Sequence, residues 1–159
     1  MSPGALRGLT LAWLVLSLLL SGLILAYDGL LWADNPKTGH AYALIGFGVI
    51  DLVLLVLVVG MPKVGLQSSF VWGLVQLVLM LANPLTAGAI GKSPGEFANY
   101  LFGLKPYSGS PDISCPYLCP PFAYSYDALM LLQLLLAITA YVGWKKARPV
   151  PPAELKAKP

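Results

Sequence analysis

The chain has 159 residues, of which 57% are hydrophobic and only 11% are charged. Its mean hydropathy is +0.74, whereas an ordinary soluble domain carries about 25% charged residues. This balance excludes an ordinary soluble domain and indicates that a lipid bilayer surrounds the chain. The formal net charge is +3, but no basic stretch is interleaved with aromatic residues as nucleic-acid binding requires. We therefore expect no nucleic-acid partner.

Four apolar stretches are long enough to cross a hydrocarbon core of about 30 Å as α-helices. They cover about residues 8–27, 41–60, 67–90 and 124–144. A cleaved signal peptide is an alternative for the first stretch, but such peptides have a shorter apolar region of about 7 to 15 residues. The sequence therefore predicts an all-α bundle of four transmembrane helices.

Glycine and proline mark the boundaries within this bundle. Gly60 and Pro62 end the second span, and Pro84 is expected to kink the third. We expect a single membrane domain over residues 1–144, with a long outer loop over residues 91–123. A flexible basic tail is expected over residues 145–159.

The basic residues predict that both termini lie in the cytoplasm, because Lys and Arg accumulate on that side of membrane proteins. Seven of them flank the spans on one side: Arg7, Lys63, Lys145, Lys146, Arg148, Lys156 and Lys158. The other side has only Lys37, Lys92 and Lys105. We therefore expect a multi-pass protein of the cell (plasma) membrane with cytoplasmic termini.

Each predicted span carries one polar side chain at a similar depth. Ser17, Asp51, Gln76 and Gln133 each lie about ten residues from the cytoplasmic boundary, or about 15 Å at the helical rise. Helices in lipid associate through small residues and hydrogen bonds rather than hydrophobicity, so polar positions mark the contacting faces. The pattern predicts one intramembrane polar layer in which Gln76 and Gln133 pair with Asp51.

An ionised carboxylate at this depth costs about 2.5 to 3.5 kcal/mol on insertion scales. Three roles for Asp51 are considered. It can staple the helices through hydrogen bonds, contact a polar group of a partner subunit, or relay protons or ions. The role of Asp51 in hydrogen bonding between the helices is favoured over the relay, because no second acid, His or Lys is expected in the core.

The outer loop contains the only two cysteines, Cys115 and Cys119. Outside the cytoplasm these are expected to form a disulfide that closes a short, proline-rich loop. A redox-active pair is the alternative, but no basic residue or His stands near them in sequence to activate a thiolate. His40 is the only histidine, so no metal site is expected.

A capping-box pattern at Ser93 predicts a short helix in the same loop. Phe97, Tyr100 and Leu101 would share one apolar face that rests in the membrane interface or contacts a neighbouring subunit. Tyr117 is a further candidate contact, since aromatic residues are common anchors at protein interfaces.

Three functional hypotheses remain open. The first is a noncatalytic accessory subunit of a larger membrane complex, which contacts lipid and other subunits or copies of itself. The second is a small transporter or channel with Asp51 in an ion or proton path. The third is a membrane thiol–quinone oxidoreductase that uses Cys115 and Cys119. We favour the first and expect no catalytic residue and no cofactor, with bound lipid left open.

Overall fold

A computed structural model describes residues 1–27, 35–89 and 122–147 of the chain. In these ranges the chain forms four α-helices and no other regular element: α1 (Pro3–Tyr27), α3 (Asn35–Gly60), α4 (Pro62–Ala89) and α6 (Phe122–Lys146). The short helix predicted after Ser93 and the predicted tail beyond Ala147 lie outside the described residues.

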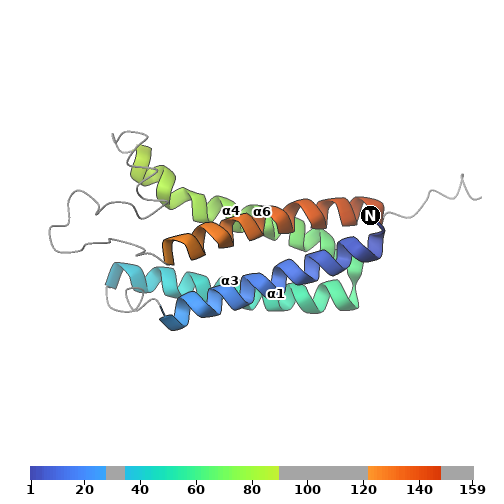
Figure 1. The fold of residues 1–159 in the computed structure, drawn as a ribbon, viewed down its shortest axis with the longest axis horizontal. Helices are drawn as coiled ribbons and strands as arrows, with labels where there is room; N and C mark the ends of the chain where they lie inside the picture. The colour runs from blue at the N-terminus through green and yellow to red at the C-terminus, as the bar shows by residue number, and fades with distance from the viewer. Residues whose placement is uncertain (28–34, 90–121, 148–159) are drawn as a thin grey trace, which may run out of the picture.

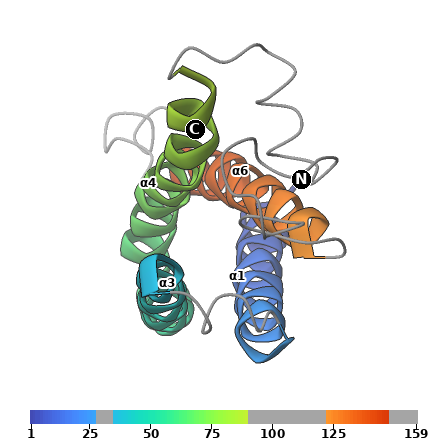
Figure 2. The ribbon, with the colours of Figure 1, turned by 90° about the vertical axis from the view of Figure 1, so that its left-hand side faces the viewer.

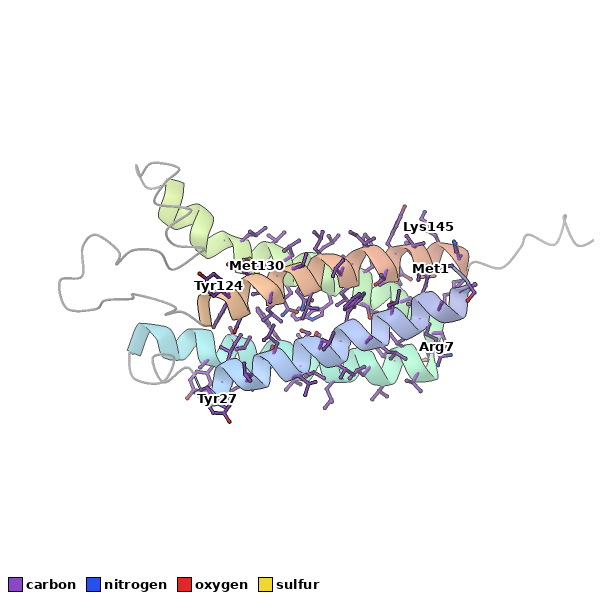
Figure 3. All side chains as sticks on the ribbon, in the orientation of Figure 1. Met1, Arg7, Tyr27, Tyr124, Met130 and Lys145 are labelled. Carbon is purple, nitrogen blue, oxygen red and sulfur yellow. The ribbon has the colours of Figure 1, made fainter. Side chains whose placement is uncertain are left out.

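The four helices run alternately up and down and surround a common axis (Figures 1 and 2). Each helix packs against the one before and after it in the chain, and α6 closes the ring against α1. Figure 3 places Met1, Arg7 and Lys145 at one end of the bundle and Tyr27 and Tyr124 at the other. We refer to these as the terminal end and the loop end.

The first helix begins at Pro3, five residues before the predicted span. Ser2 caps it, because its Oγ accepts a hydrogen bond from Ala5 N and its carbonyl accepts one from Leu6 N, both at 3.2 Å. Proline suits the first helical position, where its missing N–H would have had no partner. The apolar run therefore starts inside an existing helix rather than beginning one.

Only Met61 separates α3 from α4, and the backbones of the two helices approach closely at this turn. Met61 N donates to Leu57 O at 2.7 Å, and Gly65 N donates to Met61 O at 2.8 Å. A Cβ atom added to Gly65 would lie 2.5 Å from Val58 Cα. The turn therefore requires a residue without a side chain at Gly65.

Helix α4, the third predicted span, starts five residues earlier than predicted, with Pro62 at its first position. It continues through Pro84 to Ala89. Figure 1 shows its loop-end portion leaning away from the bundle axis, as expected for a helix that contains an interior proline.

Side chains link the helices at the terminal end. Arg7 Nη2 donates to Val59 O at 2.8 Å and so binds a carbonyl in the last turn of α3, where a positive charge is favourable. Lys146 Nζ donates to Met1 O at 3.0 Å and joins the end of α6 to the start of the chain.

All four helices contain a segment long and apolar enough to cross a membrane: Pro3–Tyr27, Ala41–Gly60, Pro62–Ala82 and Tyr124–Lys146. Large apolar side chains also point outward from every helix, including Leu19, Val56, Val78 and Leu131, each more than half exposed. Such a surface is unfavourable in water but matches lipid. The prediction of an all-helical, multi-pass membrane bundle is confirmed.

The interior has two apolar layers. Leu14, Leu54, Val58 and Leu136 form the layer nearer the terminal end, here called the terminal-side layer. Ile24, Ala41, Leu44 and Leu129 form the layer nearer the loop end, called the loop-side layer. On α1, α3 and α6, the polar residue predicted for the membrane interior falls between these two layers. On α4, Gln76 lies between Trp72 and Met80, which pack against the terminal-side and the loop-side layer.

Candidate functional site

The polar layer is centred on Asp51, whose side chain is fully buried on α3. Its Oδ2 atom accepts a hydrogen bond from Ser17 Oγ on α1 at 2.6 Å. Its Oδ1 atom accepts one from Trp72 Nε1 on α4 at 2.8 Å. Gln133 Nε2 on α6 donates to Ser17 Oγ at 2.8 Å. One connected network therefore includes a side chain from each of the four helices.

Trp72 holds its position in this network through an aromatic contact. Its ring meets Phe47 edge to face, with centroids 5.5 Å apart and an interplanar angle of 77°, a favoured arrangement for aromatic pairs. Phe47 lies one turn before Asp51 on α3, so the same helix supplies the acceptor and the support for the donor. The contact orients the indole N–H toward the carboxyl group.

Trp72 is the partner that sequence reasoning missed. The expected partners of Asp51 were the two glutamines, but Gln133 reaches it only through Ser17, and Gln76 does not reach it. Two sequence features could have identified Trp72 as a partner of Asp51. It lies one turn before Gln76 on the same face of α4, and its side chain carries an N–H donor.

Gln76 is fully buried, yet neither of its amide atoms has a hydrogen-bond partner among the described residues. The Oε1 atom of Gln133 is also buried without a partner in the described part of the chain. Both oxygens of Asp51 already accept donors from Ser17 and Trp72. The polar layer is therefore complete around Asp51 and incomplete around Gln76.

Asp127, inside the fourth span, was also passed over in the sequence. It is partly exposed, but its Oδ2 atom is buried and unpaired within the described ranges. Asp51 is thus not the sole acid in the spanning segments, contrary to the expectation that no second acid lies there. The signal was a carboxylate three residues into the predicted span 124–144.

The remaining predicted site residues lie outside the described part of the chain. They are the cysteines Cys115 and Cys119 and the proposed contact residues Phe97, Tyr100, Leu101 and Tyr117. Their predicted disulfide and interface roles stay predictions. Within the described ranges, no group of three His, Cys, Asp or Glu residues is placed to hold a metal ion.

Replacing Trp72 by Phe should lower the free energy of unfolding by about 0.5 to 1.5 kcal/mol, the worth of one hydrogen bond. The ring contact with Phe47 can persist, but Asp51 Oδ1 loses its donor. Unfolding titrations in mixed detergent micelles would measure the change. Trp13→Phe is the matched control, because Trp13 Nε1 is buried without a partner among the described residues. A loss of equal size in both variants would contradict the assigned role of the Trp72 N–H group.

The fold and this layer define the chain as a multi-pass α-helical membrane protein with a buried polar network joining its spans. Comparison with known protein families, with curated proteins and with solved structures finds no match.

Proposed function

We propose that this protein is a noncatalytic accessory subunit of a larger membrane complex. The observation that carries the proposal is the Asp51 network, which ties all four helices together with hydrogen bonds of 2.6 to 2.8 Å. Both carboxyl oxygens are taken up by donors inside the bundle, which suits a structural staple. The chain would then provide a stable four-helix body whose apolar outer surface contacts lipid and neighbouring subunits.

The proposal includes an orientation with both termini in the cytoplasm of a cell-membrane protein. Arg7, Lys145 and Lys146 gather at the terminal end, and basic residues favour the cytoplasmic side. Aromatic rings that commonly sit at the membrane interface accompany them. The ring centroids of Tyr141 and Trp144 lie 6.2 Å apart, and Lys145 Nζ lies 5.4 Å from each of them.

Purification from native membranes in a mild detergent tests the proposal. The full chain carrying an affinity tag should retain partner subunits at a fixed ratio through two successive, chemically different columns. Deleting the gene should also reduce assembly of those same partners into their complex. A chain that elutes alone as a 16.9 kDa polypeptide, with no effect of its deletion on any membrane complex, would contradict the proposal.

A second candidate is a small transporter or channel with Asp51 in a proton or ion path. The unpaired buried amide of Gln76 near the Asp51 network favours it, because polar groups within membrane spans often mark such paths. Flux of protons or ions into liposomes that contain the purified chain would support this candidate if Asp51→Asn abolished the flux. The absence of flux above that of empty liposomes would exclude it for this chain alone.

A further inference from the structure

Gln76 occupies a closed position between the two apolar layers. Trp72, one turn toward the terminal end on the same face of α4, packs against the terminal-side layer. Met80, one turn toward the loop end, packs against the loop-side layer. The Gln76 side chain itself is 0% exposed. Neither a lipid nor a side chain of another subunit can therefore reach its amide group.

Gln133 lies on α6, and its backbone is close to that of α4 one turn from Gln76. Helices α4 and α6 are in contact, and Gly73, three residues before Gln76, brings the two backbones together. A Cβ atom on Gly73 would lie 3.0 Å from Gln133 O and 3.1 Å from Ala137 N.

The unpaired atoms of the two amides are complementary to a water molecule. Gln76 offers two N–H donors and one acceptor, and Gln133 Oε1 offers another acceptor. A buried amide without partners is costly, particularly at membrane depth. Buried water typically makes about three hydrogen bonds to such groups. A water that accepts from Gln76 Nε2 and donates to both Oε1 atoms gives each of these three unpaired atoms one partner.

We infer that the bundle holds bound water between Gln76 on α4 and Gln133 on α6, at the depth of Asp51. Through Gln133 and Ser17, this water is connected to the carboxyl group by hydrogen bonds. The site is closed to solvent and to lipid, because the side chains of Gln76 and Gln133 are 0% exposed and lie between the two apolar layers. The inference holds whether or not the chain serves as an accessory subunit, since it concerns the interior of the bundle alone.

Solid-state NMR of the full chain in lipid bilayers tests this site directly. The sequence contains three glutamines, Gln67, Gln76 and Gln133, so labelling glutamine with nitrogen-15 yields three side-chain amide signals. Gln67, which is exposed near the terminal end, gives the transfer rate at an exposed side chain, and magnetisation from water protons should also reach the Gln76 side chain through the bound water. The backbone amide of Gln76, bonded within α4, should receive it much more slowly.

The Gln76→Leu variant tests whether the two glutamines share the water. The Gln133 side-chain signal should lose most of its transfer from water in this variant, while the Gln67 signal keeps it. If the Gln76 side chain of the unmodified chain received no faster transfer than its own backbone amide, the proposal would be overturned. A direct bond between the two glutamine side chains would then replace it. An unchanged Gln133 signal in Gln76→Leu would equally overturn the shared site.

Discussion

Replacing Asp51 by Ala should lower the free energy of unfolding by about 1 to 3 kcal/mol. Hydrogen bonds between membrane helices are worth about 0.6 kcal/mol on average and about 1.7 kcal/mol at most, and this change removes two of them. It also leaves the Ser17 hydroxyl and the Trp72 N–H group buried without their acceptor, which adds a penalty. Unfolding by increasing fractions of a denaturing detergent, followed by far-ultraviolet circular dichroism, would measure the change.

Two further variants are compared with Asp51→Ala. Leu52→Ala is the matched control, since Leu52 follows Asp51 on α3 but is 58% exposed toward the surrounding lipid. It should change stability little. The free energy of unfolding of Asp51→Asn should lie between those of Asp51→Ala and Leu52→Ala. The Asn amide oxygen still accepts one hydrogen bond, whereas its NH₂ group faces the second donor. If Asp51→Ala were as stable as Leu52→Ala, the network would not hold the helices together.

Replacing Gly65 by Ala should lower the free energy of unfolding by about 2 kcal/mol or more, at least as much as Asp51→Ala. The new Cβ atom would lie 2.5 Å from both Leu57 C and Val58 Cα. These are backbone atoms of α3, so relief requires the two helices to separate at the turn, and such overpacking typically costs about 1 to 3 kcal/mol. A lower melting temperature in detergent micelles, measured by intrinsic tryptophan fluorescence, would reveal the loss.

Gly60→Ala is the control for this experiment, because Gly60 belongs to the same turn but has no heavy atom within 4 Å of its added Cβ. Alanine is also a better helix former than glycine. The melting temperature of the Gly60→Ala variant should therefore stay unchanged or rise slightly. Equal melting temperatures for the Gly65→Ala and Gly60→Ala variants would show that α3 and α4 do not approach each other as closely as described.

The amino-acid composition and the length of the apolar runs were enough to predict lipid as the solvent and four helices long enough to span it. Long apolar runs leave the chain no favourable alternative to helices in lipid, because every backbone polar group must be paired within its own segment. The depth of Ser17, Asp51, Gln76 and Gln133 also followed from counting residues at a constant helical rise. Helix starts were less visible, since Ser2 and Pro3 begin α1 before its apolar run.

Which polar groups form hydrogen bonds with one another depends on the packing of the four helices. Residue counting gives a depth along the membrane, whereas hydrogen bonding also depends on how each helix is rotated and which helices are neighbours. Trp72 therefore replaces the glutamines as a direct partner of Asp51, and Gln76 remains unpaired at the same depth. The close approach at Gly65 likewise depends on the distance between two backbones, which no local pattern of residues specifies.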